Sequence, residues 1–325
     1  MSPATTPTSS RSRSVSGEAG FHSIDAPRSL RRTLAAFRAG AGDPTTRLEP
    51  GRFRRATLTP AGPATIQLTW ASDPAPVGAE RLDAVAWGPG ADWMLARVDR
   101  LTGADDLPVV FDDAHPVVAR ALAATRTHRI GASASLYHEL LPVVIAQRIT
   151  AGEARRQWVR LCRELGGTPP GPADSVAGLR LPPAPESLYR RPAWWFHPLG
   201  IERSRARTLV ELARHPTKLF GWADLPPARA WAMLTKLPGV GPWTAGSVLG
   251  PALGDPDAVP VGDYHFPSAV AWALAGEPRA DDERMLQLLA PYAGQRGRVL
   301  HAIVRTAGRA PAFGPRQRIL PIARW

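Results

Sequence analysis

Two segments in the first third of the chain alternate apolar and polar residues with the period of a β-strand. Residues 64–70 read Ala-Thr-Ile-Gln-Leu-Thr-Trp, with an apolar side chain at every second position. Residues 82–87 alternate less regularly, and the run Gly88-Pro89-Gly90 interrupts them. Together these segments predict a small α/β region over residues 28–112.

From about residue 115 onward the apolar residues recur at helical spacing. One stripe contains Pro142, which predicts a kink, and its apolar members are Leu136, Leu140, Leu141, Val144 and Ile145. A second stripe ends at Gly166-Gly167 and consists of Trp158, Leu161, Cys162 and Leu165. Gly and Pro divide the remaining sequence into short helical stretches, so the chain is predicted to be mainly α-helical.

The charge of the 325-residue chain is strongly positive: 40 lysines and arginines oppose 28 acidic residues, for a formal net charge of +12. This excess predicts a polyanionic partner. The alternative is an arginine-rich composition bias, because Lys218 and Lys236 are the only lysines. Residues 1–27 are rich in Ser, Thr, Pro and Arg and predict a disordered basic tail. The arginines within residues 28–55 form either a phosphate-contacting face or merely a soluble one.

Cysteine content and hydropathy exclude several classes of protein. Cys162 is the only cysteine, so an internal disulfide, a multi-cysteine zinc site and an iron–sulfur cluster are excluded. No apolar run approaches the roughly 20 residues that span a membrane, and no secretory signal is expected. We therefore expect no membrane partner and a cytoplasmic location, at the nucleoid if the protein is bacterial.

The most informative run is Leu-Pro-Gly-Val-Gly-Pro-Trp-Thr-Ala at residues 237–245, between two predicted helices. Gly239 and Gly241 permit a tight turn with close backbone approach, and Pro242 suits the first turn of a helix. Amides at that helix start can bind a phosphate oxygen without reading the base. The alternative is an ordinary connector between helices.

A loop rich in Gly and Pro follows at residues 255–262 and stops at Asp263, immediately before another predicted helix. A carboxylate in this position either caps the helix or faces a cleft. Asp255 and Asp257 lie earlier in the loop and fit a functional role less well.

The hairpin, the loop and the run at residues 143–150 together resemble the helix–hairpin–helix superfamily of DNA glycosylases, which carries a Gly/Pro-rich loop and an aspartate. Within it the sequence is most similar to the 3-methyladenine DNA glycosylase II family. The resemblance covers residues 115–305 well, residues 28–112 less well, and the tail not at all. It implies two helical lobes within residues 113–325, with Asp263 in the cleft between them.

The resemblance implies that Asp263 is the catalytic residue of an enzyme that removes alkylated bases, of the 3-methyladenine type, in base excision repair. Its carboxylate would stabilise an oxocarbenium-like state and orient or deprotonate a water. Trp243 stands where bifunctional relatives have a lysine, so a monofunctional enzyme is expected. The alternatives are a glycosylase for another damaged base and an inactive DNA-binding protein.

The partner implied by the resemblance is double-stranded DNA with a damaged base, bound by a monomer. The expected DNA contacts are Gly239, Gly241, Lys236, Thr244, Gln147 and Arg148. Arg148 matches the side chain that fills the gap left by the extruded nucleotide in relatives. An exposed polar helix end is the alternative for Gln147 and Arg148.

The expected base pocket consists of Trp243, Tyr264 and Ser247. Aromatic faces attract cationic alkylated purines, although core packing is the more common role of such side chains; the other aromatic candidates are Phe266, Trp194 and Trp195. Ser247 departs from the aromatic residue that is frequent in the family, which predicts a pocket that is either wider or differently tuned. His265 either hydrogen-bonds near Asp263 or faces solvent.

No cofactor is expected except a monovalent cation at the hairpin. In relatives backbone carbonyls hold this ion, and the matching carbonyls belong to Thr235, Leu237 and Val240. This expectation follows from the resemblance alone.

Overall fold

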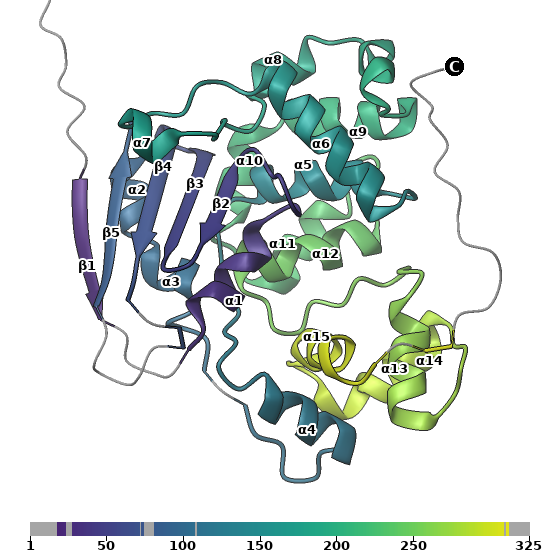
Figure 1. The fold of residues 1–325 in the computed structure, drawn as a ribbon. Coiled ribbons are helices and arrows are strands. Elements are labelled where there is room, and N and C mark those ends of the chain that lie inside the picture. The colour runs from purple at the N-terminus through teal and green to yellow at the C-terminus, as the bar shows by residue number, and fades with distance from the viewer. Residues whose placement is uncertain are drawn as a thin grey trace, which may run out of the picture.

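The computed structural model describes residues 18–23, 28–71, 73–74, 81–107, 109–308 and 310–311. Figure 1 shows a sheet with short helices on one side and two groups of helices on the other. This arrangement confirms the predicted fold class, mainly α-helical with a small N-terminal α/β region. No helix in the described ranges is both long and apolar enough to cross a bilayer.

The N-terminal region is a five-stranded antiparallel sheet in the order β1-β5-β4-β3-β2. Its strands are β1 (Glu18–Ser23), β2 (Thr46–Glu49), β3 (Arg52–Thr59), β4 (Gly62–Thr69) and β5 (Arg81–Trp87). The short helices around it are α1 (Leu30–Leu34), η1 (Ala35–Phe37), α2 (Ala91–Leu95) and α3 (Val98–Thr102). The two predicted strands are confirmed as β4 and β5. The tail prediction is wrong at residues 18–23, which pair with β5 as β1; its residues 1–17 and 24–27 lie outside the described residues.

Strand β3 explains why the arginines of residues 28–55 do not form one phosphate-contacting face. The side chain of Arg55 is only 1% exposed, and Arg28 and Arg54 are also buried. Arg55 donates to Glu139 at 2.5 Å and to the Phe37 carbonyl at 2.7 Å. An ionised guanidinium is retained in the interior only when its donors are paired in this way. For these positions the phosphate-contact alternative is therefore wrong.

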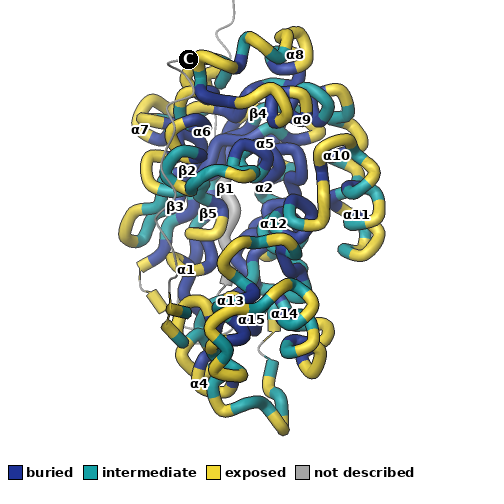
Figure 2. Tube along the Cα trace, turned by 90° about the vertical axis from the view of Figure 1, so that its right-hand side faces the viewer, coloured by how far each residue is buried: buried dark blue, intermediate teal, exposed yellow. Residues whose placement is uncertain are grey.

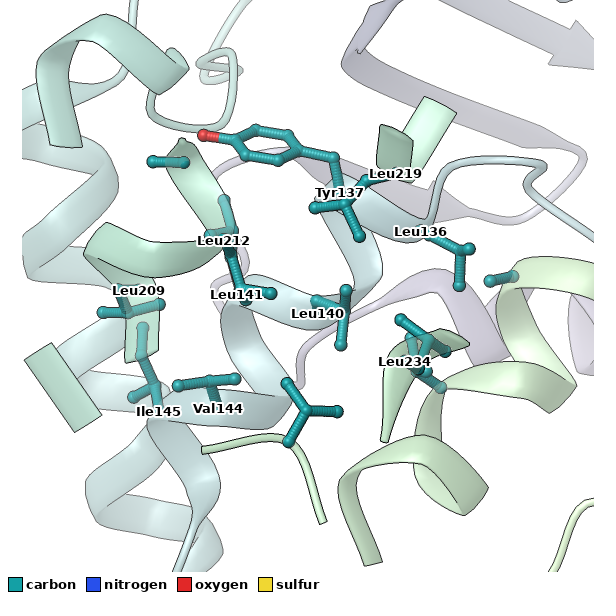
Figure 3. Packing of buried hydrophobic residues seen from close by; sticks show 14 of the residues in the cluster. Leu136, Tyr137, Leu140, Leu141, Val144, Ile145, Leu209, Leu212, Leu219 and Leu234 are labelled. Atoms are coloured by element: carbon teal, nitrogen blue, oxygen red, sulfur yellow. The ribbon is translucent and has the colours of Figure 1, made fainter. Parts of the chain in front are cut away.

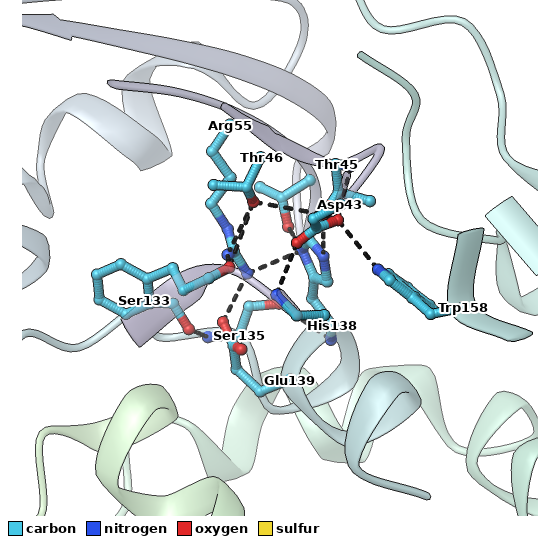
Figure 4. A network of polar contacts seen from close by, with 12 residues as sticks. Asp43, Thr45, Thr46, Arg55, Ser133, Ser135, His138, Glu139 and Trp158 are labelled. Carbon is cyan, nitrogen blue, oxygen red and sulfur yellow. Dashed lines mark hydrogen bonds and ion pairs between the residues drawn. The ribbon is translucent and has the colours of Figure 1, made fainter. Parts of the chain in front are cut away.

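A buried polar network continues from Arg55 to the helical region (Figure 4). Arg55 Nη2 donates to His138 Nδ1 at 3.0 Å, and His138 Nε2 lies 3.1 Å from Thr45 Oγ1. Thr45 Oγ1 donates to Asp43 Oδ1 at 2.9 Å, and Trp158 Nε1 donates to the same oxygen at 3.0 Å. Because a guanidinium only donates, His138 Nδ1 accepts and Nε2 carries the proton. The network fixes the sheet against the helices.

The first helical lobe is built around α5 (Leu136–Ala146), which is the helix predicted from the apolar stripe. Its remaining helices are α6 (Ala151–Leu165), α8 (Pro185–Tyr189), η2 (Ala193–Leu199), α9 (Arg203–Ala213), α10 (Pro216–Trp222), α11 (Pro227–Leu234) and α12 (Pro242–Leu253). The short helix α7 (Ala173–Val176) packs against β3 of the sheet instead. Leucines from α9, α10 and α11 pack against α5 in Figure 3, and Figure 2 shows α5 buried beneath more exposed helices. Pro142 lies within the continuous helix α5.

The second helical lobe combines one early helix with the C-terminal helices. It consists of α4 (Pro116–Ala124), α13 (Phe266–Ala275), α14 (Asp282–Leu289), η3 (Ala290–Tyr292) and α15 (Arg296–Thr306). Its core joins Val118 of α4 to Val299, Leu300 and Ile303 of α15. The chain thus crosses from α4 to the first lobe and returns after α12, so the segment between α12 and α13 connects the two lobes.

Candidate active site

The predicted hairpin connects α11 to α12 and leaves the start of α12 without a side-chain cap. Gly241 is the N-cap residue, Pro242 is the first helical residue, and no side chain bonds the free amides there. The first amides of a helix have no partner within the helix and carry partial positive charge. Gly241 is exposed, and a Cβ added to it would meet no atom within 4 Å. The helix start is therefore open to an anion.

Gly239 sets the tight geometry of the turn. Its φ is +82°, and a Cβ built on it would lie 1.9 Å from the Thr208 side-chain oxygen on α9. Only glycine adopts this backbone conformation freely and leaves room for Thr208. The turn is thus pressed against α9, a contact that the sequence did not reveal because Thr208 is distant along the chain.

Gln147 ties the end of α5 to the hairpin. Its side-chain amide donates to the Gly239 carbonyl at 2.9 Å and to Thr244 Oγ1 at 2.9 Å. Gln147, Gly239 and Thr244, all of them expected DNA contacts, therefore lie together. The Thr244 side chain is only 2% exposed, however, so the expected contact of this side chain with DNA is wrong. Thr244 instead orients Gln147.

Arg148 follows Gln147 and projects from the end of α5 into solvent. Its φ is +58°, a left-handed conformation that costs a non-glycine residue about 1 kcal/mol. It has no ion-pair partner in the described part of the chain. Lys236 of the hairpin is also exposed and likewise unpaired among the described residues. Two cations therefore stand beside the open start of α12.

Along the chain, Asp263 follows the helices of the first lobe and precedes α13 of the second lobe. Its two carboxylate oxygens have different hydrogen-bond partners. Oδ1 accepts hydrogen bonds from the backbone amides of His265 at 2.8 Å and Phe266 at 3.1 Å, at the start of α13. Oδ2 accepts from Trp243 Nε1 of α12 at 3.1 Å. The carboxylate thus caps a helix, as one alternative predicted, while its second oxygen is turned toward the hairpin helix. The Asp263 side chain stays partly accessible to solvent.

The rest of the Gly/Pro loop is held by internal contacts. Asp255 Oδ1 accepts the Asp257 amide at 2.9 Å, and Asp257 Oδ1 accepts Arg296 Nε at 2.9 Å. A Cβ on Gly246 of α12 would lie 2.2 Å from the Val259 carbonyl oxygen, so the loop packs directly on that helix. Asp255 and Asp257 therefore stabilise the loop, which agrees with their exclusion as catalytic candidates.

Three further polar side chains, which sequence reasoning missed, connect α15 to the start of α13 and to the segment that follows α4. His301 of α15 packs edge-to-face on Phe266 at 6.0 Å between ring centroids. Burial and then Arg305 lower the pKa of His301 to about 4, and the Asp263 charge opposes this shift. Arg305, one turn later on α15, donates to His128 Nδ1 at 2.6 Å. We call His128, His301 and Arg305 the histidine–arginine cluster. The signal available in the sequence was a histidine and an arginine four residues apart, separated by three apolar residues.

Comparison with known proteins supports the fold but gives no sequence match: no family model and no curated protein sequence matches the chain. A 3-methyladenine DNA glycosylase from Archaeoglobus fulgidus has a similar structure, with a TM-score of 0.69 and 17% identity over 89% of this chain and 98% of that one. This chain has the fold of the helix–hairpin–helix DNA glycosylases.

A second protein with the same fold is the 8-oxoguanine glycosylase/lyase of Clostridium acetobutylicum. Its apo structure has a TM-score of 0.60 and 13% identity, over 89% of this chain and 97% of that one. In complex with double-stranded DNA containing cytosine opposite 8-oxoguanine, its TM-score is 0.58 at 13% identity, over 89% and 98% of the two chains. The glycosylase fold thus extends over the N-terminal sheet as well as the helical lobes.

The aromatic candidates separate into two groups on this fold. Trp243 and Phe266 contact Asp263 directly, and Ser247 lies one turn after Trp243 on α12. Tyr264 is 86% exposed and packs edge-to-face on the His265 ring, at 4.9 Å between centroids. Trp194 and Trp195 lie on η2, away from the loop. His265 contributes its backbone amide to Asp263, while its side chain is exposed.

The expected cation site comprises the backbone carbonyls of Thr235, Leu237 and Val240. The Leu237 carbonyl accepts the Val240 amide at 3.0 Å. The carbonyls of Thr235 and Val240 accept no backbone hydrogen bond from the described residues outside helices and strands. Two oxygens without donors fit a monovalent cation, so the site stays a prediction. No group of three or more His, Cys, Asp or Glu that suits a metal is found within the described ranges.

Proposed function

We propose that this protein is a monofunctional DNA glycosylase that hydrolyses the N-glycosidic bond of a damaged base in double-stranded DNA, the first step of base excision repair. The observation that carries the proposal is the position of the Asp263 carboxylate. It is held by Trp243 of the hairpin helix on one side and by the start of α13 on the other. A negative charge is thereby fixed next to an open, anion-binding helix start.

The chemistry follows from this charge. As the bond between C1′ and the base nitrogen lengthens, its electron pair moves to the base and positive charge develops on the sugar. A carboxylate near C1′ stabilises that charge more in the transition state than in the ground state. Water then adds to C1′, and Asp263 orients it or accepts its proton. Three donors on the carboxylate hold it in one orientation throughout.

The proposal of a monofunctional enzyme rests on the residues available as amine nucleophiles. Forming a Schiff base requires a lysine beside C1′. The chain has only Lys218 and Lys236, on α10 and on the hairpin, and Trp243 occupies the inner face next to Asp263. Water is then the nucleophile, and the product is an abasic site in an unbroken strand. In this respect the proposal differs from the neighbour named a glycosylase/lyase.

DNA binding is assigned to the hairpin and the end of α5. The amides at the start of α12 would hold one phosphate, with Gly241 allowing close approach. Lys236 would neutralise a second phosphate, and Arg148 would enter the stack behind the extruded nucleotide. A net charge of +12 supports a duplex as the partner. We expect a monomer to suffice, because a single chain provides all these groups, and we expect it to act in the cytoplasm.

The substrate class is a damaged purine. The sequence resemblance favours alkylated purines of the 3-methyladenine type. Of the two structural neighbours, one is named for 3-methyladenine and the other for 8-oxoguanine.

The experiment is a base-release assay on duplexes that each carry one defined lesion, with wild type and Asp263→Asn. We expect release by the wild type and a loss of about 10²–10³-fold in the variant, the scale of removing one main electrostatic contact. Asp282→Asn is the matched control, since Asp282 bonds the Gly262 amide of the same loop at 3.0 Å. Equal release by wild type and Asp263→Asn would leave only a DNA-binding protein. Alkali-independent strand cleavage would contradict the monofunctional assignment.

A further inference from the structure

A hollow of about 660 Å³ lies where α1 of the N-terminal region meets the end of α4 in the second lobe. The two segments are joined beside it, because the Ser29 amide donates to the Thr127 carbonyl at 2.7 Å. Leu48 of β2 and Asp73, which follows β4, complete its wall. Small-molecule sites have volumes of roughly 300–1,000 Å³, so the hollow is large enough for such a ligand. None of its described lining residues belongs to the proposed active site or to the proposed DNA contacts.

Four arginines line this hollow: Arg31 and Arg32 of α1, Arg38 after η1 and Arg126 after α4. We call it the arginine hollow. None of the four guanidiniums has a hydrogen bond or an ion pair with a described residue. Asp73 is the one acid among the described lining residues, and its Oδ2 accepts the backbone amide of Arg31 at 3.2 Å. The hollow thus has an excess of positive charge, which attracts anions.

Arg38 indicates a ligand independently of this charge. Its Nε is buried and has no hydrogen-bond partner among the described residues. Native structures leave few buried donors without an acceptor, because the loss of hydration is then not compensated. A phosphate in the hollow would supply acceptor oxygens, and a guanidinium binds such oxygens through two parallel N–H groups.

The arginine hollow and the hairpin belong to opposite ends of α12. Both walls of the hollow are tied to the segment after α4, since the Arg129 amide of that segment donates to the Thr33 hydroxyl of α1 at 3.2 Å. The same segment then reaches the C-terminal end of α12, where the Ser133 amide donates to the Pro251 carbonyl at 2.9 Å. The hairpin lies at the start of this 12-residue helix, which is about 18 Å long. The hollow is therefore separate from the phosphate site proposed at the hairpin.

We propose that the arginine hollow binds a compact anion of linked phosphates, either a free polyphosphate or the triphosphate of a nucleotide. Linked phosphates concentrate several negative charges in a small volume, which matches four guanidiniums around one hollow. A DNA strand instead presents single charges in a row along its backbone. Because Arg32 and Arg126 come from different lobes, one bound anion would hold the end of α4 against α1. The proposed site does not depend on glycosylase activity.

The first test is isothermal titration calorimetry of the full chain with tripolyphosphate, with ATP and with adenosine, at physiological salt. We expect one tripolyphosphate or one ATP to bind per chain with a Kd below about 100 μM, and adenosine not to bind. Equal affinities for the two phosphate ligands would mean that the phosphates alone are recognised, whereas at least tenfold tighter binding of ATP would identify a nucleotide site. If neither phosphate ligand shows saturable binding, the inference is wrong.

The second test removes one exposed cation from each wall with Arg32→Gln and Arg126→Gln. The matched controls are Arg163→Gln on the exposed face of α6 and Lys236→Gln on the hairpin. We expect each hollow variant to weaken tripolyphosphate binding at least tenfold and each control to weaken it less than twofold. If only Lys236→Gln weakens it, the anion binds at the hairpin and the inference fails. Affinity of Arg126→Gln for a duplex with an abasic analogue should stay within twofold of wild type. A larger loss of duplex affinity would assign these arginines to DNA and would overturn the inference too.

Hydrogen–deuterium exchange of the wild type with and without tripolyphosphate locates the bound anion. We expect slower exchange in α1 and in residues 123–127, which form the two walls of the hollow. Residues 237–241 of the hairpin should exchange at an unchanged rate. Slower exchange in the hairpin without any change in α1 or residues 123–127 would place the anion at the start of α12 and would overturn the inference.

Discussion

The Trp243 indole donates a hydrogen bond to the Asp263 carboxylate at 3.1 Å, across 20 residues of sequence. Trp243 lies in the first turn of α12, and Asp263 ends the loop that leads into the second lobe. One contact therefore sets the distance between the uncapped start of α12 and the carboxylate. A duplex held by the hairpin would present its sugar at a fixed distance from Asp263.

Replacing Trp243 with phenylalanine tests this relationship, because the ring is kept and the N–H is removed. A hydrogen bond to a charged acceptor contributes about 1.5–3 kcal/mol, so we expect base release to fall roughly 10- to 100-fold. Affinity for abasic duplex should change little. The control is Trp231→Phe on α11, since Trp231 is partly buried and distant in sequence from the carboxylate. Equal rates for wild type and Trp243→Phe would show that the indole does not position Asp263.

Local sequence signals predicted the parts of the fold that depend on short-range patterns. Strict alternation identified β4, and the apolar stripe with its flanking residues identified α5. The Gly-Val-Gly turn and the Asp263 loop were found because glycine and proline restrict the backbone locally. These signals were enough to place the hairpin and the candidate carboxylate.

The remaining features depend on partners that are distant in sequence. Strand β3 was missed because Arg54 and Arg55 read as surface residues, and only the pairing of Arg55 with Glu139 makes its burial favourable. The burial of Thr244 depends on Gln147, 97 residues earlier. The histidine–arginine cluster depends on the packing of α15 against α4. Periodicity contains no information about such pairs.

The two hairpin glycines should respond differently to alanine. Gly239→Ala places a methyl group 1.9 Å from the Thr208 oxygen at a φ of +82°, so we expect about 1–3 kcal/mol lower stability and weaker DNA binding. Gly241→Ala has open space and an ordinary φ, so stability should change by less than about 0.5 kcal/mol while DNA affinity falls. Thermal unfolding measures the stability, and fluorescence anisotropy with an abasic duplex measures the DNA affinity. Equal melting temperatures for the two variants would contradict the Thr208 contact.

Replacing Arg148 with glycine should lower base release without lowering the stability of the protein. Glycine adopts the observed φ of +58° without strain, so we expect the variant to unfold at the wild-type temperature or slightly above it. Base release should nevertheless fall, because glycine cannot fill the space of an extruded nucleotide. Arg155→Gly, within helix α6, is the contrasting control: it should lower stability by about 1 kcal/mol. Undiminished release by Arg148→Gly would exclude Arg148 as the intercalating residue.

The buried network around His138 should make stability depend on pH. Burial, and then Arg55, lower the pKa of His138 well below 6.5 in the folded protein. Below pH 6.5 the unfolded chain binds a proton there that the folded chain does not bind, so stability falls as the pH falls. By pH 5 this loss reaches about 2 kcal/mol for one histidine. Urea unfolding at pH 7.5 and pH 5 measures this loss in the free energy of unfolding.

The matched variant for this measurement is His138→Gln, which keeps a polar side chain but cannot titrate. His128 and His301 also have lowered pKa values, about 3 and about 4, and they destabilise the wild type and the variant equally at low pH. Subtracting the two pH profiles therefore isolates His138. We expect the variant to be less stable than wild type at pH 7.5, because it loses bonds to Thr45 and Arg55. The difference should shrink by about 2 kcal/mol at pH 5. Parallel profiles would mean that His138 accepts a proton in the folded state, and the tautomer assigned from Arg55 would then be wrong.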